Sequence, residues 1–153
     1  MKIYVDNDAM PRPLKEVLFK VAQREKIYIF FISAHEQNLP GSEFIYSIGA
    51  GTAFNAADDW IAEHVNSGDL VITADIPLAD RAITKGAEVL NTKGEFFTAA
   101  NIKNALAMRE LLEELRITGD FTGGPPPFSD RQRIKFTDAL NRFLTKAKSR
   151  KNC

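Results

Sequence analysis

The stretch KIYVDNDAM, residues 2–10, predicts a short strand that ends at two carboxylates, Asp6 and Asp8. Pro11 then suits the first turn of a helix, because proline has no N–H group to leave unpaired there. The helix predicted after it reaches about Lys26 and carries apolar residues at the spacing of one helix face: Leu14, Val17, Leu18 and Val21. The chain therefore begins with a strand, an acidic turn and a helix.

The same alternation of strands and helices continues along the chain. Apolar runs rich in β-branched and aromatic residues predict four more strands: residues 27–33, 43–48, 69–74 and, as the last strand, 87–90. Helical patterns lie between them: residues 55–66 and Pro77 to about Lys85. Near-continuous apolar strands that alternate with helices are typical of a parallel sheet covered on both faces. We therefore expect a three-layer α/β fold with a mostly parallel central sheet.

Two longer helices are predicted after the sheet, each with an apolar stripe that is expected to pack into the core. The first stripe is Ile102, Ala105, Leu106, Leu112 and Leu115, and the second is Phe136, Leu140, Phe143, Leu144 and Ala147. Ser129 and Gln132 have the spacing of a capping box at the start of the second helix. The prolines of TGGPPPFSD, residues 122–130, predict an extended polyproline-type segment before it.

Length and composition predict one soluble domain over residues 1–153. The chain has 153 residues, of which 44% are hydrophobic and 26% charged, as in ordinary globular domains. A single cysteine, Cys153, excludes a disulfide framework and a CxxC zinc site. The chain enters a strand at once without a signal-peptide pattern, and no apolar run reaches the roughly 18 residues of a membrane span. We therefore expect a cytoplasmic protein with no membrane partner.

The charges are distributed unevenly. Residues 1–129 carry 12 Lys and Arg against 18 Asp and Glu, a net charge of −6, whereas residues 130–153, a predicted basic helix and tail, carry 8 against 2, a net charge of +6. One interpretation is a solvated helix face and a frayed tail. The other is a surface, including Arg131 and Arg133, that contacts a phosphate backbone.

Two arginines of the preceding helix have the same double interpretation. Arg109 and Arg116 lie seven residues apart and share one helix face. They are candidates for a phosphate clamp. The alternative is ordinary surface ion pairing with Glu110 or Glu113.

Acidic residues follow the predicted strands at the edge where open α/β sheets bind ligands. Asp6 ends the first strand and Asp75 ends the strand over residues 69–74. If these strands are neighbours, their ends lie about 4.8 Å apart. Asp58 shares the helical phase of Ile61 and Val65, which predicts that it faces inward. The carboxylates are therefore expected to meet at one rim of the sheet.

Several carboxylates in one crevice repel each other unless a cation or protons intervene. Oxygen ligands without His or Cys suit Mg²⁺ or Mn²⁺, and Mg²⁺ is often held by one or two carboxylates together with substrate phosphates. Metal-assisted phosphoryl transfer is the chemistry that such a site performs. We predict that Asp6, Asp58 and Asp75 are catalytic and that Asp8 and Asp80 complete the metal site.

Most of these aspartates also have a purely structural interpretation. Asp8 can cap the first helix, and Asp75 is a natural N-cap for the helix that follows it. Asn55 and Asp58 resemble a capping pair. Asp6 lies too early in the chain to cap the helix that starts near Pro11.

Five motifs, in order along the chain, resemble the YaiI/YqxD family of uncharacterised bacterial proteins. They are IYVDNDAMP (3–11), NAADDWI (55–61), GDLVITADIPLA (68–79), NIKNALAMRELLEELR (101–116) and GGPPPFS (123–129), and the resemblance extends to about Phe143. The family is grouped by resemblance with PIN-like domains, α/β folds whose nuclease members use clustered carboxylates with Mg²⁺ or Mn²⁺. The resemblance implies a site at Asp6, Asp58 and Asp75, with Asp8 matched in the first motif and Asp80 matched less directly.

This chain departs from the family pattern at two positions. Asn7 and Met10 stand where the family usually has Ala and Cys. Met10 excludes a thiol role at that position. Because the family is uncharacterised, the resemblance implies a fold and a site more than a function.

Three functions remain open from the sequence. The first is a metal-dependent nuclease that acts on RNA or single-stranded nucleic acid, and the second is a nucleic-acid-binding protein without turnover. The third is a phosphatase of the haloacid-dehalogenase type, in which Asp6 would be the nucleophile and Asp8 the acid/base. Ala9 and Met10 follow where that motif usually has Thr or Val, and no cap insertion is evident, which counts against the third.

Overall fold

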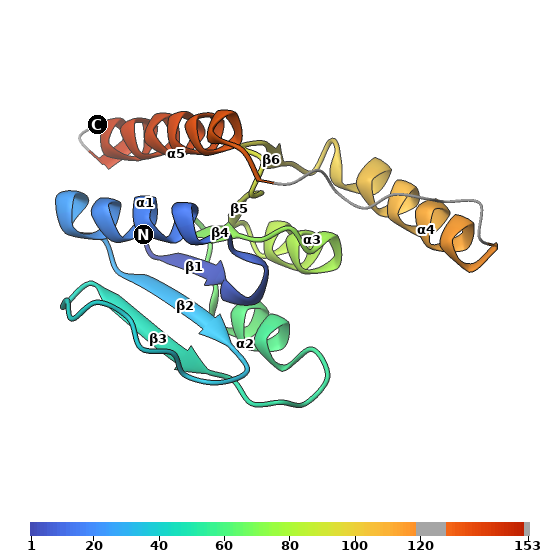
Figure 1. Ribbon diagram of the computed structural model, residues 1–153. Helices are drawn as coiled ribbons and strands as arrows, with labels where there is room; N and C mark the ends of the chain where they lie inside the picture. The colour runs from blue at the N-terminus through green and yellow to red at the C-terminus, as the bar shows by residue number, and fades with distance from the viewer. Residues whose placement is uncertain (119–127, 152–153) are drawn as a thin grey trace.

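A six-stranded sheet in the order β3-β2-β1-β4-β5-β6 forms the centre of the protein (Figure 1). The computed structural model describes residues 1–118 and 128–151. The strands are β1 (Ile3–Asp6), β2 (Ile29–Ser33), β3 (Ile45–Gly49), β4 (Leu70–Ile72), β5 (Glu88–Leu90) and β6 (Phe96–Phe97). The first five pair in parallel, and β6 runs antiparallel to β5. The predicted mostly parallel sheet is confirmed.

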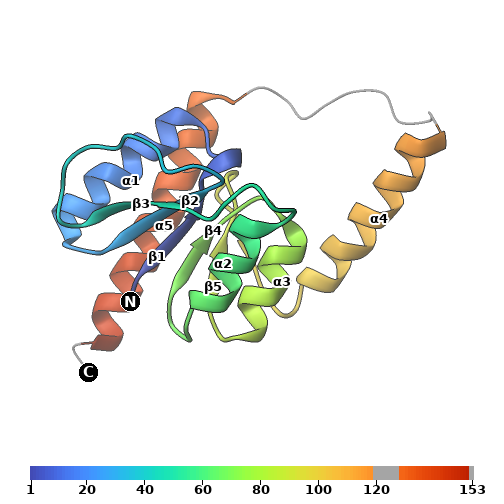
Figure 2. The same cartoon turned by 90° about the horizontal axis from the view of Figure 1, so that it is seen from below.

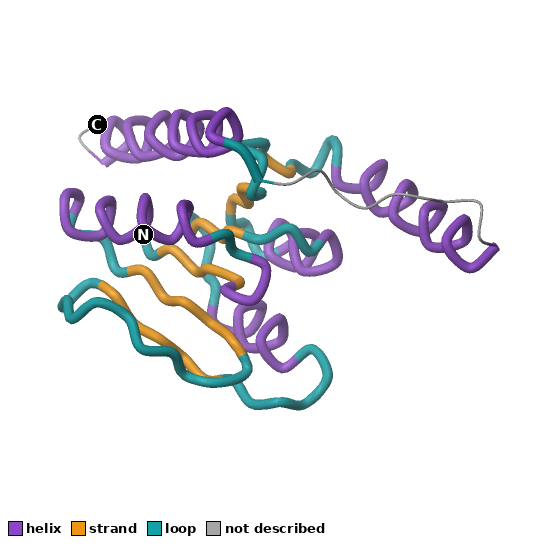
Figure 3. Tube along the Cα trace, in the orientation of Figure 1, coloured by secondary structure: helices purple, strands orange, loops and turns teal. Residues whose placement is uncertain are grey.

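Helices cover both faces of this sheet, as Figure 3 shows. They are α1 (Arg12–Glu25), α2 (Ala56–His64), α3 (Ile76–Thr84), α4 (Ile102–Thr118) and α5 (Asp130–Lys151), with a short 3₁₀ helix, η1 (Asn7–Ala9), after β1. Side chains of α1 and α5 pack on one face, and side chains of α2 and α3 pack on the other. The three layers predicted from the sequence are therefore present.

Strand alternation divides the apolar residues between two cores. Ile3 and Val5 of β1 are buried in the core under α1 and α5, whereas Tyr4 faces the core under α2 and α3. Phe31 and Ile32 of β2 divide in the same way. Each fully buried side chain of this kind contributes roughly 1.5–3 kcal/mol. A strand covered on both faces needs apolar residues at every position, which explains the unbroken apolar runs in the sequence.

The strand predicted over residues 87–90, which is β5, was expected to be the last, and this expectation was wrong. β6 follows it after a tight turn and adds an antiparallel edge. Gly94, in that turn, has φ +82°, and a Cβ atom there would lie only 2.7 Å from the backbone of Lys135 in α5. A two-residue strand is too short to produce a periodic pattern, so it could not be recognised from the sequence.

The apolar stripe of α4 was also expected in the core, and this is only partly correct. Ile102 is buried and Leu106 packs beside it against the α2–α3 core. Further along the stripe, Leu112 and Leu115 are only half-buried. Met108 and Leu111 beside them are about half exposed, and α4 extends away from the body of the protein (Figures 1 and 2). The stripe of α5 is core as predicted, with Phe136, Leu140, Phe143 and Leu144 buried.

The start of α5 is only partly the predicted capping box. The Gln132 backbone N–H donates to the Ser129 hydroxyl at 3.3 Å, but the Gln132 side chain donates to the Thr92 carbonyl instead of returning to the cap. The predicted polyproline-type segment falls largely on residues 119–127, outside the described residues. No helix within the described ranges is both long and apolar enough to span a bilayer.

Candidate active site

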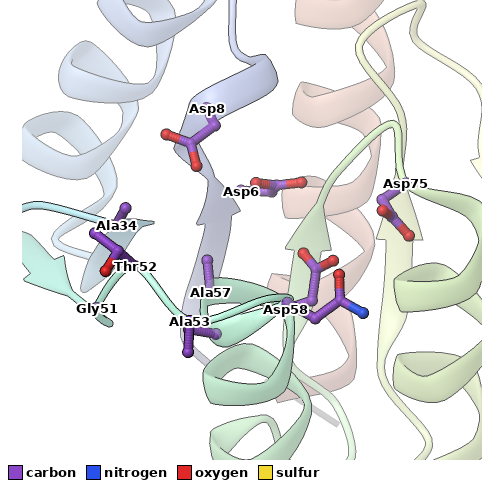
Figure 4. A pocket seen from close by; sticks show the side chains of 11 residues that line it. Asp6, Asp8, Ala34, Gly51, Thr52, Ala53, Ala57, Asp58 and Asp75 are labelled. Atoms are coloured by element: carbon purple, nitrogen blue, oxygen red, sulfur yellow. The ribbon is translucent and has the colours of Figure 1, made fainter.

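The carboxyl ends of the parallel strands and the start of α2 enclose an acidic cleft of about 280 Å³ (Figure 4). Asp6, Asp8, Asp58 and Asp75 line it, and the rest of the wall consists mainly of small residues: Ala34, Gly51, Thr52, Ala53, Ala56 and Ala57. β1 and β4 are neighbours in the sheet, as the grouping of Asp6 with Asp75 required. Asp80, further along α3, is not among the lining residues.

Asp6 is the most enclosed of the four carboxylates. Asp6 is the last residue of β1 and is only 8% exposed. Its Oδ2 accepts a hydrogen bond from the Thr73 hydroxyl at 3.0 Å. Burial raises the pKa of Asp6, the Thr73 hydrogen bond opposes this, and the nearby charges of Asp75 and Asp8 raise it further. Asp6 therefore carries its negative charge at a cost to the folded state.

Asp58 occupies the first turn of α2 and shows the strongest effect of crowding. The pKa of Asp58 is raised to about 6, chiefly by burial and also by the nearby charges of Asp75 and Asp6. Asn55, at the N-cap position, has a left-handed backbone (φ +59°) and makes no capping hydrogen bond. The capping interpretation of Asn55 and Asp58 is therefore wrong. The interaction of Asp58 with both Asp6 and Asp75 places the three carboxylates in one electrostatic group.

Asp75 combines a structural contact with a place in the cleft. Its Oδ1 accepts a hydrogen bond from the Leu78 backbone N–H at 2.9 Å, which caps α3 as predicted. Asp8 does not cap α1, because Pro11 occupies the N-cap position of that helix and no side chain caps it. Helix capping therefore engages one carboxylate oxygen of Asp75, and Asp8 has no capping role.

The donors fit a hard divalent cation, although they do not form a closed cage. Within residues 1–118 and 128–151, no three His, Cys, Asp or Glu side chains lie close enough together to hold one ion. Asp6 and Asp75 each have one oxygen engaged by a described hydrogen bond and a second oxygen outside those bonds. Mg²⁺ keeps several waters and needs only one or two protein carboxylates, which suits this open arrangement.

Thr73 links the two strand-end carboxylates, and sequence reasoning missed it. It is 1% exposed; its hydroxyl donates to Asp6 and accepts from the backbone N–H of Asp75 at 2.9 Å. One hydroxyl therefore sets the position of Asp6 relative to the turn that carries Asp75. A threonine at the end of an apolar strand carries no recognisable signal of such a contact.

Thr73→Val is expected to destabilise the protein by about 1–3 kcal/mol, because it removes both hydrogen bonds from a buried site. It should also weaken Mn²⁺ binding by about 10- to 100-fold, the usual effect of losing a group that orients a metal ligand. Thr73→Ser keeps the hydroxyl and should retain the affinity while losing less than about 1.5 kcal/mol. Urea denaturation and Mn²⁺ titration of both variants test this. Equal Mn²⁺ affinities in the two variants would contradict the positioning role.

Three of the four predicted phosphate-binding arginines have described side chains. Arg109 pairs with Glu113 at 3.3 Å, and Arg133 is 4.0 Å from Asp130, while Arg131 is exposed near the start of α5. None of these three lines the cleft. Arg116 belongs to α4, and its side chain lies outside the described residues.

A different arginine lies beside the acidic group and was also missed. Arg81 of α3 pairs with Asp59 at 2.7 Å, and its charge partly offsets the raised pKa of Asp58. The two partners are 22 residues apart and belong to different helices. Their pairing depends on how α2 and α3 pack, which the local sequence does not specify.

The protein is a three-layer α/β protein with an acidic cleft outside the carboxyl ends of its parallel strands. In open α/β proteins of this class, that edge of the sheet is where ligands bind. The chain is a member of the YaiI/YqxD family, since the family model described as "Uncharacterized BCR, YaiI/YqxD family" matches residues 4–146. A protein of Maridesulfovibrio salexigens is 47% identical over 150 residues, covering 98% of this chain and 99% of its own. A protein of Hahella chejuensis is 43% identical over 146 residues, covering 95% and 97%. Both are named only "UPF0178 protein".

No solved structure matches the chain significantly. The family description and the names of these relatives state no activity. The function is therefore argued from the cleft.

Proposed function

We propose that the protein is a nuclease that hydrolyses phosphodiester bonds with the help of Mg²⁺ or Mn²⁺. The observation that supports this proposal is the convergence of Asp6, Asp58 and Asp75 on one cleft, where the charge of Asp75 raises the pKa of both Asp6 and Asp58 and the charge of Asp6 raises that of Asp58 further. Groups with shifted pKa values in a cleft are typical of functional sites. A structural network would supply cations to neutralise the carboxylates, whereas in the described part of the chain Arg81 is the one cation that lowers the pKa of Asp58.

The chain's own residues would hold and orient the ion. One or two of Asp6, Asp58 and Asp75 would bind the ion directly and the others through its coordinated waters, with Asp8 at the edge of the cleft. A bound divalent ion lowers the pKa of a coordinated water and neutralises charge on the displaced oxygen. Thr73 fixes Asp6, and the hydrogen bond from the Leu78 N–H fixes Asp75, so two of the carboxylates are oriented before any ligand arrives. Oriented charged groups of this kind supply much of the rate enhancement in such enzymes.

Cleavage of generic RNA and DNA in the presence of Mn²⁺ tests the proposal. Asp6→Asn should lower the rate at least about 100-fold, because a metal ligand is lost. Asp138→Asn is the matched control, since Asp138 is exposed on α5, on the opposite face of the sheet from α2, and should cleave like the wild type. Equal rates for Asp6→Asn and the wild type would indicate a contaminating nuclease and contradict the proposal.

Binding of nucleic acid without cleavage is the second candidate. It is favoured by the lack of a closed three-ligand cage within the described residues. Such a protein would bind RNA or single-stranded DNA with an affinity that falls as salt rises. Its affinity would be the same in Asp6→Asn, and neither form would cleave.

A further inference from the structure

Phe54 stands out among the large apolar residues of the described chain because it is 91% exposed. The other large apolar side chains at the surface retain much more burial, the next being Ile134 at 56%. A single apolar side chain at a surface needs no explanation by itself. The position of Phe54 nevertheless indicates a role, because Ala53 and Asn55 on either side of it both line the acidic cleft.

The segment that carries Phe54 is held in a specific conformation. Gly51, Thr52, Ala53 and Asn55 form part of the cleft wall just before α2. Asn55 adopts the left-handed conformation, which asparagine tolerates better than most other non-glycine residues. Phe54 is not among the lining residues; its ring is in solvent on a turn whose neighbouring residues form the cleft wall.

From this arrangement we infer that Phe54 stacks on a base of single-stranded nucleic acid whose backbone lies in the acidic cleft. This inference rests on the proposed nuclease function and specifies its substrate. Base–aromatic stacking is a general means of binding single strands, since every base offers a flat face. A duplex offers no such face, because its bases are already paired and stacked. The wall of small residues leaves room for a backbone to approach Asp6, Asp58 and Asp75.

Tyr46, an exposed aromatic residue of the sheet, is a poorer candidate for this contact. Tyr4, Phe30 and Tyr46 stack on each other across β1, β2 and β3, with ring centroids 5.2–5.4 Å apart and planes within 19° of parallel. Their faces are therefore largely occupied by one another. Tyr46 is 41% exposed, but neither it nor its chain neighbours line the cleft, which makes it a suitable control for a nonspecific aromatic contact.

Fluorescence anisotropy tests the inference with a labelled single strand that has a hydrolysis-resistant phosphorothioate backbone, in the presence of Mn²⁺. Phe54→Ala should weaken binding by about 5- to 100-fold, the usual effect of losing one stacked base. Phe54→Trp should restore the affinity, and Tyr46→Ala should bind like the wild type. Because Phe54 makes almost no contact with the core, Phe54→Ala should also keep the wild-type melting temperature.

A strand with abasic sites in place of all bases separates stacking from other contacts. Phe54→Ala and the wild type should bind this strand, and a duplex, with equal affinity. Equal affinities of the two proteins for the strand with bases would overturn the inference while leaving cleavage and its loss in Asp6→Asn unaffected. A change in oligomeric state on Phe54→Ala would assign the residue to contact with a second copy instead. If the wild type neither binds nor cleaves any strand, both the inference and the proposed function fail.

Discussion

Without divalent ions, the Asp58→Asn variant is expected to be more stable than the wild type by about 1–2 kcal/mol near pH 7.5. The pKa of Asp58 is raised to about 6 in the folded protein, against about 3.9 in an unfolded chain. A shift of this size corresponds to roughly 2.9 kcal/mol, and we reduce it because Asp58 is only half-buried and screened by solvent. Asparagine removes the charge while keeping the shape of the side chain.

The stability difference between Asp58→Asn and the wild type is expected to depend on pH. The folded pKa lies above the unfolded one, so between about pH 4 and pH 6 the folded state binds more protons than the unfolded state. This group therefore makes the wild type less stable as pH rises through that window, and the advantage of Asp58→Asn should grow over the same range. Below about pH 4 the two proteins should have equal stability. Urea denaturation in EDTA at a series of pH values measures the difference.

Asp59→Asn is the matched control for this experiment. Asp59 is the next residue of α2, but its carboxylate is half exposed and pairs with Arg81. Its removal is expected to change stability by less than about 1 kcal/mol, with no gain over the wild type at neutral pH. Two results would contradict the crowding of the carboxylates. One is an Asp58→Asn variant that is less stable than the wild type at pH 7.5, and the other is a difference in stability that is the same at every pH.

Mn²⁺ is expected to raise the melting temperature of the wild type by about 5–10 °C when present at about 100 times its dissociation constant. Binding to the folded state at that concentration adds about 2.7 kcal/mol, and a chain of this length gains about 2–4 °C per kcal/mol. Asp6→Asn and Asp75→Asn should lose most of this increase. Both substitutions preserve the local hydrogen bonds, because asparagine can accept from Thr73 and can cap α3.

The controls separate a specific site from general screening of negative charge. Asp138 lies on α5, which covers the other face of the sheet. The Asp138→Asn variant should therefore show the full increase in melting temperature with Mn²⁺. Equal increases in the wild type and in Asp6→Asn would mean that the ion acts elsewhere. The same increase with a monovalent salt of matched ionic strength would also contradict a bound divalent ion.

The parts of the structure governed by local pattern were predictable from the sequence. Unbroken apolar runs such as residues 27–33 identified strands covered on both faces, and the alternation with helices predicted a parallel sheet. The rule that ligands bind at the carboxyl ends of strands grouped Asp6 with Asp75 correctly in space. The helical phase of Asp58 likewise predicted its place in the cleft, whereas Asp59 lies at the surface.

The features that were missed depend on contacts between distant parts of the chain. Thr73 and Arg81 act through residues 67 and 22 positions away, and nothing local distinguishes them from ordinary threonines and arginines. α4 has an amphipathic pattern that does not reveal which neighbour, if any, covers it. The exposure of Phe54 follows from the turn before α2, which the short motif around it does not specify.

Equilibrium binding of Mn²⁺, followed by electron paramagnetic resonance of the free ion, tests the central claim most directly. The account predicts that the wild type binds the ion near pH 7.5, that the affinity falls as the pH is lowered through about 6, where Asp58 becomes protonated, and that Asp6→Asn loses the site. A wild type that binds no Mn²⁺, or an Asp6→Asn variant that binds it equally well, would contradict a metal site built from these carboxylates.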